Sequence, residues 1–193
     1  MSEMMDFTTI VPKWRPRVKP VDLDAATPEQ LEALKVTPSN RKVSDYVLVL
    51  ANDVETLKVR SPLFNAIMYH RQGLGRAERE LGAVGSSIVN RCIYCTAVHA
   101  GRYNQLTGTE DVIERVFADG EDAELDARDA AILKFAVRLS RTPMEADAGD
   151  IERLREAGLD EGEILDLVLS TALFGWANRL MHTLGDPEPG EAG

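Results

Sequence analysis

Residues 78–101 read ERELGAVGSSIVNRCIYCTAVHAG and contain both cysteines of the 193-residue chain, Cys92 and Cys95, with one of its three histidines, His99. The preceding residues 76–89 carry apolar side chains at helical spacing: Leu81, Val84, Ile88 and Val89. Residues 90–91 interrupt this pattern before the Cys-Ile-Tyr-Cys run begins a second one. The stretch therefore predicts two consecutive helices and places the cysteines at the start of the second.

A helix start is a favourable place for a reactive thiol. Unpaired backbone N–H groups and the positive end of the helix dipole stabilise a thiolate, so at least one thiol should have a lowered pKa. Cys92 and Cys95 are three residues apart, which puts their Cα atoms roughly 5 Å apart in a helix, within the range of a disulfide. The pair can be oxidised with little backbone movement.

His99 and Glu80 complete a candidate catalytic set with the two cysteines. His99 is four residues after Cys95, so its imidazole can reach that sulfur directly or through a water. A base beside a thiol activates it. If residues 90–91 make a hairpin, the carboxylate of Glu80 returns toward the cysteines, where it can orient the histidine or accept a proton. We predict Glu80, Cys92, Cys95 and His99 as catalytic residues.

The spacing of these four residues resembles a known signature. Glu, eleven residues, Cys, two residues, Cys, three residues and His is similar to the motif of the AhpD-like alkylhydroperoxidases in the carboxymuconolactone decarboxylase superfamily. The resemblance extends over about residues 44–185, where LDARDAAILKFAVRLSRTP and DEGEILDLVLSTALFGWANRLMHTLG are similar to the peroxidase-related branch. One departure is Tyr94, which stands where the characterised type often has His, so any secondary role of that histidine is absent.

The resemblance implies a thiol-dependent peroxidase or disulfide reductase acting on alkyl hydroperoxides. It implies that Cys95 becomes a sulfenic acid, that His99 and Glu80 relay its proton through water, and that Cys92 donates a proton and resolves the intermediate to a disulfide. The position at the helix start, taken alone, favours Cys92 as the more exposed nucleophile. The reductant implied is a dithiol, such as a lipoyl or thioredoxin-like protein.

Other interpretations of the motif stay open. The cysteines can be inert buried thiols, and Glu80 alone can be a solvated partner of Arg76 or Arg79. A single zinc ion is disfavoured, because Cys92 and His99 are separated by about 10 Å of helix rise. A cofactor-free carboxymuconolactone decarboxylase-like enzyme would need the histidine but no cysteine pair. A non-catalytic redox-sensing oligomer would keep the pair without turnover.

Composition limits the partners and the location. The chain has 22 basic and 32 acidic residues and a net charge of -10, which argues against binding nucleic acid or an anionic membrane. The N-terminal residues lack the apolar core of a signal peptide, and the apolar residues 164–177 are too short and interrupted to span a bilayer. No metal, flavin or nucleotide motif is present, so no cofactor and no metal are expected. We predict a cytoplasmic protein.

The pattern of apolar residues predicts an all-α, AhpD-like helical bundle. We expect an extended arm and short helix over 1–43, a helical domain over 44–185 and a disordered tail over 186–193. Within the domain, the active hairpin spans 76–107 and a second half spans 124–185. A helix over 45–60 should end at Ser61-Pro62, which would cap a further helix reaching His70.

Two features go beyond a simple bundle. Residues 78–99 align with 161–182, matching Glu80 with Glu163 and His99 with His182, and this predicts an internal helical-hairpin repeat that has lost its cysteines. The last helix is apolar on nearly every side, and the proline-rich arm has no core of its own. Members of the superfamily are homo-oligomers, commonly trimers or hexamers, so the resemblance implies an obligate homo-oligomer that buries part of the last helix and Trp14. The arm can equally be a strap over its own chain.

Overall fold

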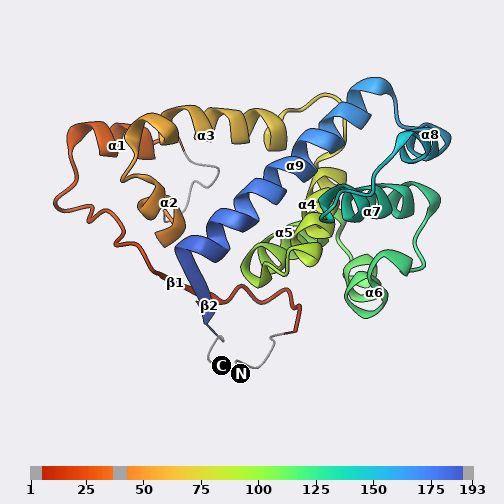
Figure 1. Cartoon of the computed structure of the whole chain (residues 1–193), viewed down its shortest axis with the longest axis horizontal. Coiled ribbons are helices and arrows are strands. Elements are labelled where there is room, and N and C mark those ends of the chain that lie inside the picture. Colours follow the sequence, from red (N-terminus) through yellow and green to blue (C-terminus); the bar gives the residue numbers. More distant parts are fainter. Residues whose placement is uncertain (1–5, 37–42, 189–193) are drawn as a thin grey trace.

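The computed structural model describes residues 6–36 and 43–188, and these residues form a helical bundle with a two-stranded sheet at one end (Figure 1). The bundle confirms the predicted all-α class, with a small addition of strand. The elements are β1 (Lys13–Pro16), α1 (Pro28–Leu34), α2 (Asp45–Leu50), α3 (Val54–Tyr69), α4 (Arg76–Val89), α5 (Ile93–Thr107), α6 (Asp111–Asp119), a 3₁₀ turn (Gly120–Asp122), α7 (Ala127–Ser140), α8 (Ala148–Glu156), α9 (Glu161–Leu184) and β2 (Gly185–Glu188).

Helix α4 is the centre of the bundle and packs on α5, α7 and α9. Every residue from 79 to 87 is buried. Two glycines allow the close approach of its neighbours. A Cβ atom added at Gly82 would lie 2.9 Å from Leu167 Cδ1 of α9, and one at Gly85 would lie 2.9 Å from Ala136 Cβ of α7. The small residues of the motif therefore serve packing, because they let α7 and α9 approach the helix that carries Glu80.

The predicted helix over 45–60 is wrong in its boundaries. The first helix, α2, ends at Leu50, and α3 begins after Asp53. The Asp53 side chain accepts a hydrogen bond from the Thr56 backbone N–H at 3.1 Å. Helix α3 then continues through Pro62 without ending there. A proline inside a helix costs about 3 kcal/mol. Leu57, Phe64 and Met68 are buried on both sides of it, and burying such side chains stabilises the continuous helix by more than that cost.

The segment predicted as a disordered tail begins with a strand. Residues 185–188 form β2, which pairs antiparallel with β1 so that Trp14 lies opposite Pro187. Residues 189–193 lie outside the described part of the chain. The Trp14 indole is 8% exposed and packs edge-on against the Tyr46 ring at 5.8 Å between centroids. The proline-rich arm is therefore a strap over its own chain, and Trp14 is not left for a neighbouring subunit.

The structure does not show the predicted internal repeat. In the alignment of 78–99 with 161–182, the turn at residues 90–91 falls on residues 173–174, yet α9 is one continuous helix of 24 residues there. Glu163, which aligns with Glu80, forms an ion pair with Arg128 of α7 and not with a histidine.

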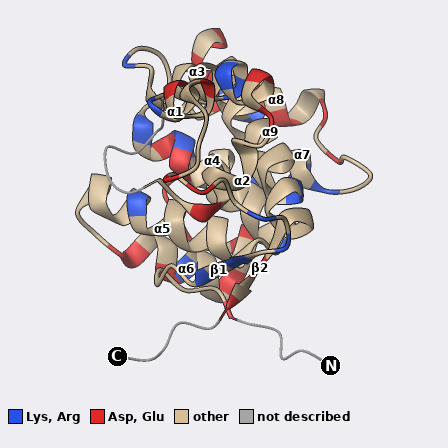
Figure 2. Cartoon of the chain, turned by 90° about the vertical axis from the view of Figure 1, so that its left-hand side faces the viewer, with Lys and Arg blue, Asp and Glu red and all other residues tan. Residues whose placement is uncertain are grey.

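The apolar character of α9 fits its place in the core. By length and composition alone it could cross a bilayer, but half of its most apolar window is buried inside the fold, and it packs on α3, α4 and α7. Core helices of soluble proteins share this property, so the helix is weak evidence for a membrane span. In the view of Figure 2, basic and acidic residues alternate along the elements and no element carries one sign alone.

Candidate functional site

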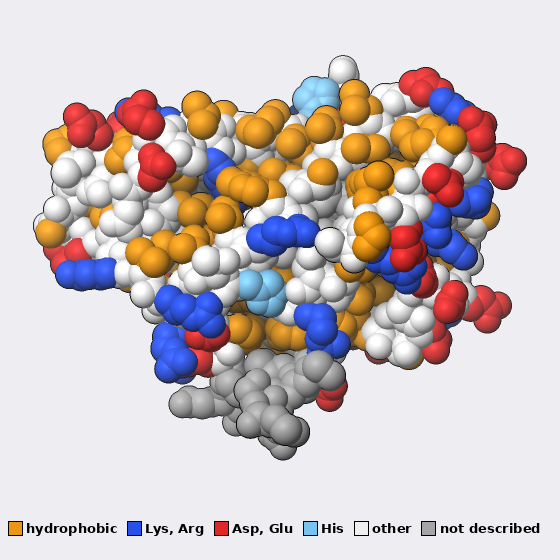
Figure 3. All heavy atoms as spheres, in the orientation of Figure 1, with side chains coloured by type: hydrophobic (Ala, Val, Ile, Leu, Met, Phe, Trp, Pro, Cys, Tyr) orange, Lys and Arg blue, Asp and Glu red, His pale blue; other side chains and the backbone are white. Residues whose placement is uncertain are grey.

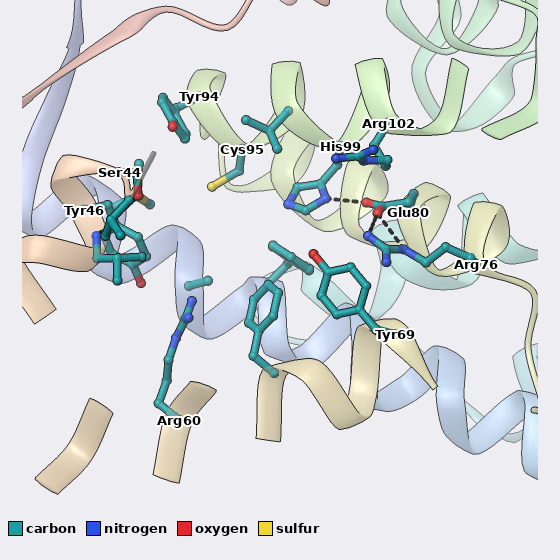
Figure 4. A pocket seen from close by; sticks show the side chains of 17 residues that line it. Ser44, Tyr46, Arg60, Tyr69, Arg76, Glu80, Tyr94, Cys95, His99 and Arg102 are labelled. Atoms are coloured by element: carbon teal, nitrogen blue, oxygen red, sulfur yellow. Dashed lines mark hydrogen bonds and ion pairs between the residues drawn. The ribbon is translucent and has the colours of Figure 1, made fainter. Parts of the chain in front are cut away.

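A cavity of about 330 Å³ is lined by residues of α2, α3, α4, α5 and α9 (Figure 4). Most of its wall is apolar, with a few polar groups that face inward, which is typical of a small-molecule site. The lining residues are Val43, Ser44, Tyr46, Val47, Arg60, Phe64, Tyr69, Arg76, Glu80, Tyr94, Cys95, Val98, His99, Arg102, Phe174, Ala177 and Met181.

Glu80 and His99 meet on the wall formed by α4 and α5. The Glu80 side chain is fully buried, and its Oε2 lies 2.5 Å from His99 Nδ1. Its other oxygen accepts a hydrogen bond from Arg76 Nε at 2.8 Å. Burial raises the pKa of Glu80, but the stronger opposing influence of His99 and Arg76 lowers it overall. Glu80 is therefore an ionised carboxylate at neutral pH.

This contact fixes the orientation of the imidazole. A carboxylate can only accept, so His99 Nδ1 donates to Glu80, and in the neutral ring Nε2 is then the proton acceptor. The ring also packs edge-on against Phe174, with 4.0 Å between centroids. Figure 4 shows the imidazole between Glu80 and Cys95, with its edge toward the cavity. His99 is thus held as a base beside the Cys95 thiol.

The two cysteines lie where the hairpin turns into α5. Cys92 is the N-cap residue of that helix, and its backbone N–H donates to the Ser87 carbonyl oxygen at 2.9 Å. Both thiols are free and buried. A hydrogen bond from the Cys95 thiol lowers the pKa of Cys92 despite burial, whereas the same bond and burial raise the pKa of Cys95 well above its ordinary value. The pair thus holds one thiolate more readily than either thiol alone, but not two.

The cysteines face different surroundings. Cys95 lines the cavity with His99, whereas Cys92 lies behind it, beneath Trp14 and Met181. Cys92 is 3% exposed and Cys95 is 6% exposed. Both thiols are almost fully buried, so exposure does not single out Cys92 as the expectation from the helix start had it, and only Cys95 lines this cavity. Strand β1 of the arm covers Cys92.

Several residues around the site were not predicted from the sequence. The sequence offered Arg76 only as the partner of a solvated Glu80. In the structure the Glu80 carboxylate is buried, and Arg76 forms an ion pair with it. Its position four residues before Glu80 was the available signal. Tyr46, Arg60 and Tyr69 reach the cavity from α2 and α3, and no local spacing connects them with the motif.

The two histidines outside the motif, His182 and His70, lie outside the cavity. His182, the counterpart of His99 in the alignment, lies 2.8 Å from the Asn90 carbonyl oxygen through Nε2 and so contacts the hairpin turn. His70 is exposed at the end of α3. Among the residues that the structure describes, no group of three or more His, Cys, Asp or Glu side chains is arranged to hold a metal ion.

Residues 55–138 match the sequence profile of the carboxymuconolactone decarboxylase family. This segment contains α3, the α4–α5 hairpin, α6 and most of α7, and hence all four predicted catalytic residues. No curated protein matches the chain.

Solved structures extend the likeness to most of the chain. A peroxidase-related protein from Silicibacter sp. TM1040 is 28% identical, with a TM-score of 0.74 over 90% of this chain and 94% of that one. A peroxidase-related protein from Ralstonia eutropha JMP134, described as an alkylhydroperoxidase AhpD core, is 27% identical, with a TM-score of 0.75 over 93% and 94%. The debrominase Bmp8 shares the fold at 17% identity, with a TM-score of 0.75 over 89% and 92%. The profile, the shared fold and the position of the motif within both lead to one conclusion: residues 55–138 are a segment of the carboxymuconolactone decarboxylase family, and the fold around it is similar to that of AhpD-like, peroxidase-related proteins.

Proposed function

We propose that this protein is a thiol peroxidase that reduces organic hydroperoxides with the Cys92–Cys95 pair. One observation carries the proposal: the Cys95 thiol and the His99 imidazole, which Glu80 orients, line the same cavity. The names of the two peroxidase-related neighbours support the same class of reaction. The apolar wall favours an organic peroxide over hydrogen peroxide.

Peroxide reduction begins with the shared proton of the cysteine pair. The Cys95 proton passes along the existing hydrogen bond to the Cys92 sulfur, which leaves Cys95 as the thiolate that faces the cavity. That thiolate attacks the terminal oxygen of the hydroperoxide, so that an S–O bond forms and the O–O bond breaks. Sulfur is oxidised to a sulfenic acid, and the peroxide is reduced to an alkoxide. The first proton that the cysteine pair loses is held by His99 Nε2, and it passes through water to the alkoxide, which leaves as the alcohol.

Resolution follows within the pair. The Cys92 thiol, which has the lower pKa, loses its proton and attacks the Cys95 sulfenic acid. An S–S bond forms, the S–O bond breaks, and the departing hydroxide takes up a proton to become water. The two residues stand at the first turn of α5, where the spacing of a disulfide can be met.

A dithiol then reduces the disulfide. We infer that it attacks Cys95, because this sulfur lines the cavity, and that Cys92 leaves as the thiolate because its pKa is the lower. The second thiol of the reductant completes the exchange and carries away two electrons as its own disulfide. A slender dithiol such as a dihydrolipoyl group suits a cavity of about 330 Å³ better than the broad surface of a thioredoxin-like protein.

The test uses single cysteine variants with cumene hydroperoxide and dihydrolipoamide. Wild-type protein should consume the peroxide, and Cys92→Ser and Cys95→Ser should each abolish turnover. After one addition of peroxide, a sulfenic-acid trap such as dimedone should label Cys95 in Cys92→Ser, and Cys95→Ser should stay unlabelled on Cys92. Turnover that survives in both variants would sink the proposal and direct attention to cofactor-free chemistry at His99.

A further inference from the structure

Arg60 is a buried cation in the cavity wall with no anion beside it in the described part of the chain. It extends from α3 and is 7% exposed, and its Nε and Nη1 atoms are buried without a hydrogen-bond partner. The other two arginines of the cavity are satisfied differently, since Arg76 pairs with Glu80 and the exposed Arg102 donates to Gln105. Among the residues that the structure describes, no ion pair involves Arg60.

Such burial is costly unless something compensates it. A guanidinium stays charged under physiological conditions, and a buried charge without a partner destabilises the fold by several kcal/mol. Aromatic contacts supply part of the compensation, because the guanidinium carbon lies 4.5 Å from the Phe64 ring centroid and 5.8 Å from that of Tyr46. They leave the N–H groups unused, because a ring face offers no oxygen acceptor.

A second unused donor lies next to Arg60. The Tyr46 hydroxyl is also buried without a hydrogen-bond partner. Burial raises the pKa of Tyr46 to about 12, although the nearby Arg60 lowers it in part, so the phenol keeps its proton at neutral pH. Arg60 and Tyr46 lie close enough for each to shift the pKa of the other. The donors that they do not supply to each other suit a ligand that accepts hydrogen bonds and carries negative charge. A carboxylate meets this requirement, because its two oxygens match the fork of a guanidinium.

Arg60 stands on the wall opposite the thiol. In Figure 4 it extends from α3 on one side of the cavity, and Cys95 extends from α5 on the other. The rest of the cavity lining is largely apolar and includes Phe64, Val98 and Phe174. A ligand that fills the cavity would therefore have an anionic end, an apolar body and a reactive end at Cys95.

We propose that Arg60 and Tyr46 form a carboxylate-binding site, and that the substrates of this protein are hydroperoxides of organic acids. Arg60 holds the carboxylate and the peroxide group points to Cys95. The identity of the substrate rests on the peroxidase function proposed above, whereas the carboxylate site itself does not.

Binding tests the site without any redox chemistry. The probes are 4-isopropylbenzoate and its uncharged analogue 4-isopropylbenzamide, measured by calorimetry on the full chain. Wild-type protein should bind the benzoate more tightly than the amide. Arg60→Met should weaken benzoate binding at least about ten-fold, which corresponds to about 1.4 kcal/mol, and should leave amide binding unchanged. Tyr46→Phe should weaken benzoate binding to a smaller extent, and Arg60→Lys should retain part of it.

Arg115→Met is the matched control, since it removes an exposed arginine of α6 far from the cavity, and it should change neither affinity. Equal binding of the two probes by wild-type protein would overturn the carboxylate site. So would an Arg60→Met variant that keeps its benzoate affinity. If wild-type protein binds neither probe and Arg60→Met alters the subunit count, the acceptor is a group of a neighbouring subunit, which also overturns the proposal.

Kinetics then test the substrate. Cumene hydroperoxide and its 4-carboxy derivative differ only in the charged group. Wild-type protein should show the lower KM for the carboxylate, and Arg60→Met should raise that KM about ten-fold while kcat and the constants for cumene hydroperoxide stay the same. If binding depends on Arg60 but neither peroxide is consumed, the carboxylate site stands and the peroxidase function fails. If both peroxides are consumed with equal KM, the substrate class proposed here is wrong.

Discussion

One proton between two sulfurs decides which cysteine reacts. The hydrogen bond from Cys95 to Cys92 places the negative charge on the Cys92 sulfur, whereas the cavity gives access to the Cys95 sulfur. Because the pair shares the proton, transfer along that bond moves the charge to Cys95 without any change in the number of protons bound. Charge and access, which point to different residues in the resting state, are reconciled by this transfer.

The thiols should ionise in two widely separated steps. Thiolate absorbance of the wild-type protein should show one ionisation below the free-cysteine value of about 8.5, because the Cys95 hydrogen bond stabilises the first thiolate. The second should lie well above that value, since a second buried charge is repelled by the first. The rate of reaction with peroxide should fall as the pH drops through the first ionisation and level off above it. Two thiols that ionise together at or above 8.5 would contradict the shared proton.

Replacing His99 with alanine should slow oxidation of the thiol pair by peroxide about 100-fold, the usual value of general acid–base assistance. The helix should persist, because His99 acts on the cavity side of α5. Stoichiometric mixing with cumene hydroperoxide measures the rate, and circular dichroism measures the helix content. His70→Ala, which removes an exposed histidine outside the cavity, is the control and should react at the wild-type rate. An unchanged rate in His99→Ala would make this residue a bystander.

The spacing of the motif predicted the local half of the site. A carboxylate on one helix of a hairpin and a histidine on the other meet because α4 and α5 lie antiparallel, and the short distance between Glu80 and His99 follows from that. Arg60 and Tyr46 could not be found in this way. They reach the cavity from α2 and α3, whose position depends on packing between parts of the chain that are distant in sequence.

At the scale of the elements, the helix starts that are capped by polar side chains could be predicted from the sequence. Asp160 with Glu163 caps α9, and Thr27 with Gln30 caps α1, as the capping-box pattern predicts. The course of α3 through Pro62 was not predictable, because a local helix signal does not include the burial of Phe64 and Met68 beyond it. The same holds for β2, since a strand of Gly, Asp, Pro and Glu forms only because β1 pairs with it.

Close packing of α4 makes a specific prediction for its glycines. Gly85→Ala should lower the free energy of unfolding by about 1–3 kcal/mol, because the added methyl group would meet Ala136 Cβ at 2.9 Å and neither group can move aside without shifting a helix. Gly101→Ala on α5 is the control. Its nearest neighbour is the Thr9 carbonyl oxygen at 3.6 Å, so the variant should be neutral or more stable by about 0.5–1 kcal/mol. Urea unfolding measures both, and equal stabilities would show that α7 can retreat freely.

The arm makes a different prediction, because Trp14 covers Cys92. Trp14→Ala should increase the rate at which iodoacetamide alkylates Cys92, measured by peptide mass spectrometry, and should increase the rate at Cys95 much less. Val11→Ala, at an exposed position of the same arm, should change neither rate. Parallel increases at both cysteines in Trp14→Ala would indicate general unfolding and contradict a local cover.

At the scale of the whole molecule, apolar side chains remain exposed along one face. They gather where α3 and α9 lie side by side, in the upper middle of Figure 3. Exposed fractions of 41% or more mark Val59, Leu63, Leu165, Leu169 and Trp176. A contiguous patch of this kind is typical of a subunit interface. Because β1 pairs with β2 and Trp14 is buried in its own chain, we place the predicted contact between subunits on this face.

We propose that the protein is a homo-oligomer, a trimer or hexamer, assembled through the face of α3 and α9. Light scattering at micromolar concentration should give a particle several times the chain mass of 21.3 kDa. Leu63→Glu should reduce it to the monomer, because a carboxylate in an apolar interface loses its hydration without gaining a partner. Leu106→Glu, at an exposed position of α5 away from this face, should leave the particle unchanged. A wild-type particle of the chain mass would refute assembly, and a Leu63→Glu particle of unchanged mass would place the interface elsewhere. Deletion of residues 1–24 should not dissociate the oligomer, since the arm lies against its own chain through Trp14 and β2.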